Sequence, residues 1–192
     1  NVTVTGTTNT RAVSINQSGT CVADVVIEGV TTVSGYTGNV FHLGTGATAT
    51  TVKLCNVVVK HGASGNVVAS SGTVGSLQMS NITQTGGTSL AYLDNGTCPL
   101  VSIDGLYCTA GLGVAWYVNA PIEIQLSGVT ATPSNGRLAG NYSTSGTVLL
   151  RGNRIAGTAT THLHRNASQT VRAVGAEVRC DVSTLTPVAG DI

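Results

Sequence analysis

The 192-residue sequence predicts an all-β fold, a single-stranded right-handed parallel β-helix of about seven to eight coils with a period of about 24 residues. Three observations predict it. Two apolar residues at alternate positions, followed after one residue by Gly or Asn, recur eight times; a second apolar run recurs with the same step; and no segment has a helical apolar pattern. Strands repeated at a constant step stack in parallel, and parallel crossovers are right-handed by default.

Each repeat corresponds to a short strand that ends in a bend. Alternate residues of a strand point to one face, so the two apolar residues mark the inward side. Gly and Asn adopt the left-handed backbone conformation most readily, which predicts a sharp bend at the same place in every coil. The bend residues are 23, 27, 25, 24, 23, 24 and 23 residues apart: Gly6, Gly29, Asn56, Asn81, Gly105, Gly128, Gly152 and Gly175. The apolar pairs are Val2 and Val4, Val25 and Ile27, Val52 and Leu54, Leu77 and Met79, Val101 and Ile103, Ile124 and Leu126, Val148 and Leu150, and Val171 and Ala173.

Two further strands complete each coil. An apolar residue usually follows the bend, so a second strand begins there, at Val30, Val57, Ile82, Leu106 and Val129. A third apolar run follows about ten residues later, with steps of 25, 27, 23, 24, 24 and 25 residues between its anchors Ile15, Val40, Val67, Leu90, Val114, Leu138 and Leu163. We therefore expect residues 1–180 to form the β-helix and residues 181–192 to be an exit segment toward a further C-terminal region.

The composition excludes several classes of protein. Leucine-rich repeats share this period but need a Leu-x-x-Leu-x-Leu run, which the chain lacks. The net charge is +1 and no basic run occurs, so the sequence lacks the basic surface that nucleic-acid binding requires. No stretch of about 18 apolar residues is present, so we expect no membrane insertion. With 41% hydrophobic residues placed in register and only 9% charged residues, the chain predicts a thin aliphatic core.

The five cysteines do not predict disulfides. No two of them occupy the same position on adjacent coils when they are counted from the nearest bend residue: Cys21, Cys55, Cys98, Cys108 and Cys180. Free thiols favour assembly in a reducing cytoplasm.

Catalytic residues are not expected within a single chain. Glycoside hydrolysis needs two carboxyl groups roughly 5 to 10 Å apart. Glu28 and Asp104 both precede a bend but are three coils apart, about 14 Å by the strand spacing. Asp24 and Glu123 share another position four coils apart. A pair formed between chains of an oligomer stays open. No activated nucleophile or phosphate-binding loop is present, and we expect no cofactor.

His162 and His164 have the one metal-like spacing. If Leu163 points inward, both imidazoles face outward on the same side, and a threefold axis would bring six of them together. They are weak metal candidates, since a polar outer face explains them equally well.

The few aromatic residues are the main candidates for binding. Tyr92 and Trp116 each lie two residues beyond their anchor on adjacent coils, which predicts that they stack; Tyr117 and Tyr107 lie nearby. Large rings on a polar rod offer apolar area with a polar edge, suited to a sugar or to another chain. Alternatively, these rings close a widened coil or pack against a neighbouring chain.

The order of strand, turn, strand, Gly/Asn bend, strand and long turn resembles the pectate-lyase-like right-handed β-helix. Among proteins with this fold, the low charge of the chain and its high content of Gly, Thr, Ser and Val are similar to those of bacteriophage tailspike or tail-fibre receptor-binding proteins. The closing segment from Thr186 to Ile192 is also similar to segments of such fibre proteins. The resemblance implies a homotrimer in the virion tail, assembled in the host cytoplasm, whose partners are host cell-surface polysaccharide and other phage tail proteins.

The functional prediction is a non-catalytic glycan-binding segment of such a fibre. The alternatives are a glycan depolymerase with an intersubunit active site, a purely structural shaft, and a secreted bacterial adhesin or ice-binding solenoid. Ice binding requires a regular Thr array, whereas the position before the bend is irregular: Thr5, Glu28, Cys55, Ser80, Asp104, Ser127, Arg151 and Val174.

Overall fold

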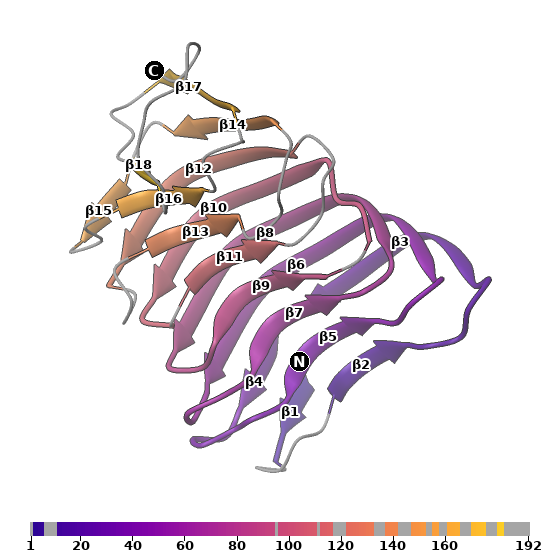
Figure 1. The fold of residues 1–192 in the computed structure, drawn as a ribbon. Helices are drawn as coiled ribbons and strands as arrows, with labels where there is room; N and C mark the ends of the chain where they lie inside the picture. Colours follow the sequence, from indigo (N-terminus) through magenta and orange to yellow (C-terminus); the bar gives the residue numbers. More distant parts are fainter. Residues whose placement is uncertain are drawn as a thin grey trace.

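The computed structural model describes residues 2–5, 11–94, 96–110, 112–116, 122–132, 137–141, 147–152, 155–157, 161–165, 170–175 and 180–182. All regular elements among these residues are strands, and no helix there is long and apolar enough to cross a membrane. The strands form two sheets (Figure 1). Sheet A contains β1 (Val2–Val4), β3 (Cys21–Glu28), β4 (Val30–Thr32), β6 (Thr48–Lys60), β8 (Thr73–Thr85), β10 (Leu100–Cys108), β12 (Ile122–Ala131), β14 (Thr147–Gly152), β15 (Ile155–Gly157) and β17 (Thr170–Gly175). Sheet B contains β2 (Arg11–Ile15), β5 (Asn39–Leu43), β7 (Asn66–Ser70), β9 (Ser89–Leu93), β11 (Leu112–Trp116), β13 (Arg137–Asn141), β16 (Thr161–Arg165) and β18 (Cys180–Val182).

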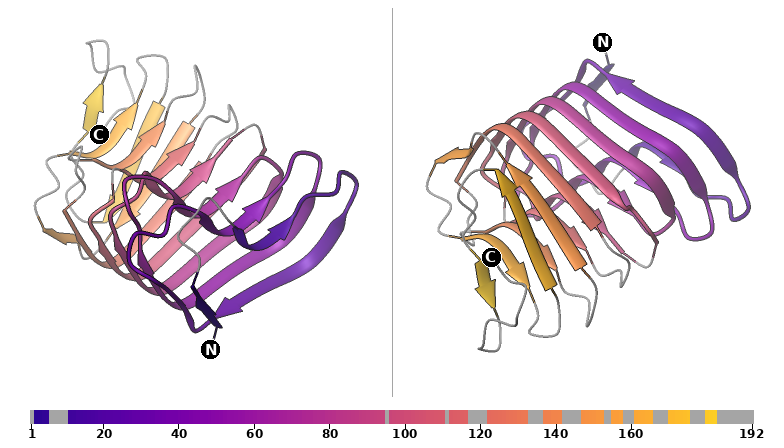
Figure 2. Two further views of the ribbon diagram at one scale, coloured as in Figure 1. Left: turned by 90° about the horizontal axis from the view of Figure 1, so that it is seen from below. Right: turned by 90° about the horizontal axis from the view of Figure 1, so that it is seen from above.

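The molecule is a parallel β-solenoid, as the repeat predicts. Each coil contributes one strand to sheet B and a bent strand to sheet A, and every pairing between described strands is parallel. About five turns with a period of about 25 residues are described most fully, and sheet B stacks eight strands. In both views of Figure 2 the colours change steadily along the stack, so successive coils lie side by side. β18 pairs with β16 as far as Val182, and residues 183–192 of the predicted exit segment lie outside the described residues.

The predicted bend is confirmed in five consecutive coils. Its residues have positive φ angles: 68° at Gly29, 55° at Asn56, 52° at Asn81, 70° at Gly105 and 60° at Gly128. Strand pairing on either side places them opposite one another. The Asn56 amide donates to Glu28 Oε1 and the Asn81 amide donates to Asn56 Oδ1, both at 3.3 Å. These bonds tie neighbouring coils together where only Gly or Asn fits readily.

The predicted register is wrong at both ends of the repeat. Val2 pairs with Val30, so β1 lies after the bend rather than before it. Gly152 pairs with Leu126 and not with Gly128, which shifts β14 by two residues. The last two repeats keep the predicted alignment with each other, since Gly152 pairs with Gly175. A period-two apolar pattern looks the same after a shift of two residues, so it does not fix the register where the bend residue is ambiguous.

The core is a narrow aliphatic column between the two sheets. In β6, Val52, Leu54, Val57 and Val59 are fully buried, while Lys53 between them is exposed. Corresponding residues of β8, β10 and β12 repeat this pattern on both sides of the bend. Burial of such ladders is the main stabilising contribution to each coil.

Polar side chains replace aliphatic ones at one corner of this core. Tyr36 is fully buried, its hydroxyl donates to the Asn39 carbonyl, and its ring stacks on His61 with 5.6 Å between centroids. His61 Nε2 lies 3.1 Å from the Gly38 carbonyl oxygen, and such a bond requires a proton on Nε2. His61 Nδ1 is therefore the acceptor in the neutral ring.

Gln84 completes this arrangement in the next coil. Its Nε2 lies 3.1 Å from His61 Nδ1 and 3.0 Å from the Ser89 carbonyl, and its Oε1 accepts from the Cys108 thiol at 3.9 Å. The geometry satisfies every polar atom of the Gln84 amide as long as His61 is neutral. Accordingly, burial lowers the pKa of His61, against a smaller raising effect of its bond to Gly38.

Candidate functional site

The predicted stack of Tyr92 on Trp116 is wrong. Tyr92 pairs with Ala115, and Trp116 pairs with Leu93, so the two residues belong to different ladders of sheet B. The prediction aligns Val114 of β11 with Leu90 of β9. In the structure Gly113 is the residue opposite Leu90, so the register differs by one residue. A Cβ at Gly113 would collide with the Leu138 carbonyl. Close approach of the next coil therefore requires Gly where an apolar anchor was expected.

Tyr92 instead shares an outer ladder with His42. The order along sheet B is Ser14, His42, Ala69 and Tyr92, and both Tyr92 and His42 are half-buried. Ser14 Oγ lies 3.4 Å from His42 Nδ1. Burial, and then the charge of Arg11, lower the pKa of His42.

Of four other predicted site residues, three are described only by their backbone and one lies outside the described residues. Trp116 ends β11, and only its backbone is described. Tyr117 lies outside the described residues. His162 and His164 belong to β16, where His164 pairs with Asp181 of β18. Among side chains that the structure describes, no group of three or more His, Cys, Asp or Glu could hold a metal ion.

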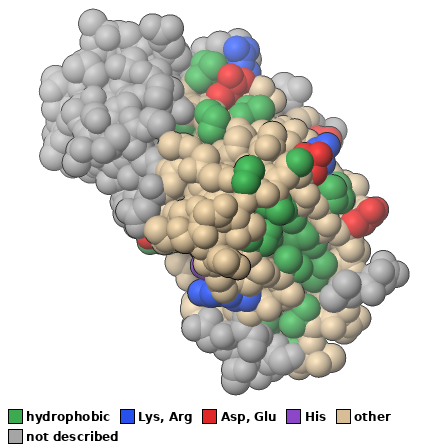
Figure 3. Space-filling model, turned by 90° about the vertical axis from the view of Figure 1, so that its right-hand side faces the viewer, with side chains coloured by type: hydrophobic (Ala, Val, Ile, Leu, Met, Phe, Trp, Pro, Cys, Tyr) green, Lys and Arg blue, Asp and Glu red, His purple; other side chains and the backbone are tan. Residues whose placement is uncertain are grey.

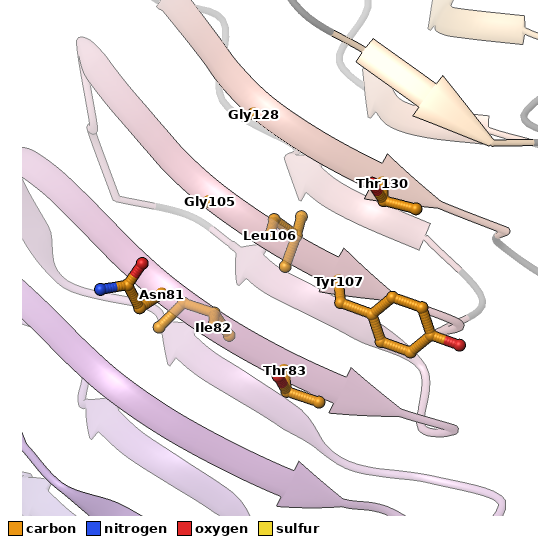
Figure 4. A pocket seen from close by; sticks show the side chains of 8 residues that line it. All are labelled: Asn81, Ile82, Thr83, Gly105, Leu106, Tyr107, Gly128 and Thr130. Atoms are coloured by element: carbon orange, nitrogen blue, oxygen red, sulfur yellow. The ribbon is translucent and has the colours of Figure 1, made fainter.

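Tyr107 is the more exposed of the two aromatic candidates whose side chains the structure describes. It lies in β10 beyond the bend, and its side chain is 48% exposed. It lines an open hollow of about 380 Å³ on the outer face of sheet A, which spans β8, β10 and β12 (Figure 4). The ring projects from the sheet between Thr83 and Thr130, its partners on the neighbouring strands. We call this cavity the Tyr107 hollow; its lining residues are Asn81, Ile82, Thr83, Gly105, Leu106, Tyr107, Gly128 and Thr130.

The bend explains why a hollow forms here. Asn81 carries a side chain at the bend, but Gly105 and Gly128 in the next two coils carry none. Two missing side chains in one ladder leave the backbone exposed beside the Tyr107 ring. The series of bend residues contains this change from Asn to Gly, since Asn56 and Asn81 are followed by Gly105 and Gly128. The change indicates a hollow only when the register of the strands is known.

A second, smaller hollow lies across the bend on the same face. Its volume is about 190 Å³, and it spans β6, β8 and β10. Two adjacent outward ladders line it, one of Lys53, Gln78 and Ser102 and the other of Cys55, Ser80 and Asp104, together with Met79. We call it the Lys53 hollow. The sequence pattern does not indicate Lys53, Gln78 or Ser102 as site residues, because single Gln, Ser and Lys side chains on an outer face are common.

The acidic residues lie where the lattice predicts. Pairing through Cys55 and Ser80 places Glu28 and Asp104 on one ladder three coils apart. Glu123 accepts from Gln125 at 2.7 Å and from Arg151 at 2.8 Å. The pKa of Glu123 is lowered, first by the Gln125 hydrogen bond and also by Arg151. These contacts hold Glu123 ionised as a surface ion-pair partner.

The described cysteines are free thiols. Cys21 is exposed, Cys55 is half-buried and accepts from the Ser80 hydroxyl at 3.2 Å, and Cys98 and Cys108 are buried. Burial raises the pKa of Cys98 to about 12 and that of Cys108 to about 11. Both buried thiols therefore stay protonated at neutral pH.

The surface is weakly charged. The face drawn in Figure 3 carries a few Lys, Arg, Asp and Glu side chains among uncharged groups and a run of hydrophobic side chains. Such a face offers hydrogen bonds and apolar contacts rather than a strong field.

No protein-family model, curated protein or solved structure matches the chain.

Proposed function

We propose that the chain is a non-catalytic glycan-binding segment of an elongated attachment protein, such as a bacteriophage tail fibre or tailspike. The Tyr107 hollow supports this proposal most directly, because it combines an exposed aromatic ring with hydroxyl groups and exposed backbone in an open cavity. The C–H faces of a sugar ring pack on an aromatic face, and its hydroxyls pair with polar groups around the edge.

The chemistry of the lining favours a glycan over other ligands. Thr83 and Thr130 supply hydroxyls on either side of Tyr107, and none of the described residues that line this hollow is charged. An open, shallow cavity along a regular surface suits one unit of an extended polymer better than an enclosed small molecule.

The wider setting is part of the same proposal. The solenoid would assemble as a homotrimer in the virion tail, with host cell-surface polysaccharide and other tail proteins as partners. A purely structural shaft and a secreted adhesin are the competing readings, and both share the fold. A depolymerase would need a carboxyl pair formed between subunits.

A glycan microarray of bacterial surface polysaccharides tests the proposal, followed by titration calorimetry with the best ligand. We expect the protein to bind, and Tyr107→Ala to lower the affinity at least tenfold with unchanged thermal stability. Val26→Ala is the matched control, because Val26 is a 63% exposed hydrophobic residue of sheet A outside both hollows. Equal affinity of Tyr107→Ala and the parent protein would contradict the site, and failure to bind any glycan would favour the shaft. Light scattering that shows a stable monomer would contradict the trimeric fibre.

A further inference from the structure

We propose that the Tyr107 hollow and the Lys53 hollow are two subsites of one groove, which crosses the bend and holds a neutral oligosaccharide of three or more sugar units. This inference rests on the proposed glycan-binding function and specifies the ligand. It gives the Lys53 hollow a role in hydrogen bonding and the Tyr107 hollow a role in stacking.

The two hollows are continuous along the chain. In β8, Ser80 lines the Lys53 hollow and the next residue, Asn81, lines the Tyr107 hollow. In β10 the same is true of Asp104 and Gly105. From Gln78 to Thr83 the path along β8 is roughly 16 Å, from a strand rise of about 3.3 Å per residue. Together the hollows span β6 to β12, three strand spacings of about 4.8 Å each. A groove of this extent exceeds the length of a disaccharide.

The Lys53 hollow has a surplus of hydrogen-bonding groups. Lys53, Gln78, Ser102 and Asp104 line it, and none of these side chains has a hydrogen-bond or ion-pair partner among the described residues. They offer an ammonium, an amide, a hydroxyl and a carboxylate. A carboxylate accepts two hydrogen bonds from neighbouring sugar hydroxyls, and an amide both donates and accepts. By contrast, two other lining residues already form a hydrogen bond with each other, since the Ser80 hydroxyl donates to Cys55 Sγ.

The charges indicate a neutral ligand. Lys53 and Asp104 lie two coils and two residues apart, about 12 Å by the strand spacing and the rise per residue, which is more than the Debye length of about 8 Å at physiological salt. The described lining of the Lys53 hollow therefore has one positive and one negative group and no net charge, and the described lining of the Tyr107 hollow adds none. An acidic polysaccharide would meet the Asp104 carboxylate with no net attraction to offset it. A neutral hexose chain uses both groups as hydrogen-bond partners.

The test is titration calorimetry with linear neutral oligosaccharides of two to six hexose units, drawn from the manno-, gluco- and galacto-series, and with an oligogalacturonate series for comparison. We expect affinity to rise with length up to about four units and to favour a neutral series. Gln78→Ala and Asp104→Asn should each weaken tetrasaccharide binding at least fivefold and leave disaccharide binding unchanged. Tyr107→Ala should weaken both.

Gln125→Ala is the matched control for Gln78→Ala. Gln125 occupies the same outward ladder two coils further on and lines neither hollow. Loss of affinity in Tyr107→Ala alone, with no effect of Gln78→Ala, Asp104→Asn or ligand length, would overturn the two-subsite groove and leave the proposed function standing. Preference for oligogalacturonates would overturn the neutral ligand. Absence of binding to every oligosaccharide would overturn both proposals.

Discussion

Gly128→Asn should close the Tyr107 hollow without disturbing the bend. At φ 60° a Cβ on Gly128 would lie 3.4 Å from Gly105 N, 3.6 Å from Gly105 Cα and 3.8 Å from Asp104 Oδ1, which are ordinary contacts. Asn already occupies this conformation at Asn56 and Asn81, where the amide points along the ladder toward the preceding coil. An Asn at position 128 would thus place its amide over Gly105, inside the hollow.

The expected magnitudes separate binding from folding. Asn tolerates the left-handed region, and replacing Gly reduces the entropy of the unfolded chain, so we expect the free energy of unfolding to change by less than about 1 kcal/mol. For a chain of this size that is a Tm shift of at most about 4 °C. We expect glycan affinity to fall at least tenfold, which is about 1.4 kcal/mol.

The assay is titration calorimetry with the best glycan, together with thermal unfolding followed by circular dichroism. Gly29→Asn is the matched control, because Gly29 has the same bend conformation, with φ 68°, and lines neither hollow. It should keep full affinity. Unchanged affinity in Gly128→Asn would refute the role of the hollow, and a large fall in Tm would refute the equivalence of Gly and Asn at the bend.

Three further predictions concern stability. Asn56→Val should lower the free energy of unfolding by about 2 kcal/mol, because a β-branched residue is strained at φ 55°, whereas Asn56→Gly should retain most of it; equal denaturation midpoints for both would contradict the bend. Because the pKa of His61 is lowered in the folded state, the unfolded chain takes up its proton first, so stability should be constant above pH 6.5 and fall below it. Urea denaturation at pH 7.5 and 5.5 should show a smaller loss in His61→Gln than in the parent, and an equal loss would contradict the neutral ring. Ser89→Ala should raise the free energy of unfolding by about 1 kcal/mol, since the buried Ser89 hydroxyl has no partner among the described residues. The control Ser70→Ala should lower it, because Ser70 donates to the Gly72 carbonyl, and an equal fall in both would count against this assignment.

The bend and the period could be predicted because a single backbone requirement selects the residue type. Positive φ at one place per coil needs Gly or Asn, and only those residues recur there from Gly29 to Gly128. The register at the ends of the repeat could not be predicted in this way. The apolar alternation of β1 is the same as that of a strand before the bend, and only its pairing with β4 places it after the bend. Local pattern gives the strand, and long-range pairing gives its place.

The site depended on side chains from different coils. The positions of Tyr107 and Asp104 on the lattice were predictable, but the hollows beside them arise from what neighbouring coils lack, as at Gly105 and Gly128. Likewise, Gln84 takes an inward position that is aliphatic in Val59 of the preceding coil. Its pairing with His61 follows from the three-dimensional register and from no local motif.

The crystal structure of the protein bound to its best oligosaccharide tests glycan binding at the bent outer face of sheet A most directly. We expect one sugar ring to stack on Tyr107 between Thr83 and Thr130, with the chain continuing across the bend toward Gln78. A ligand bound only to the outer face of sheet B, beside His42 and Tyr92, would contradict this account.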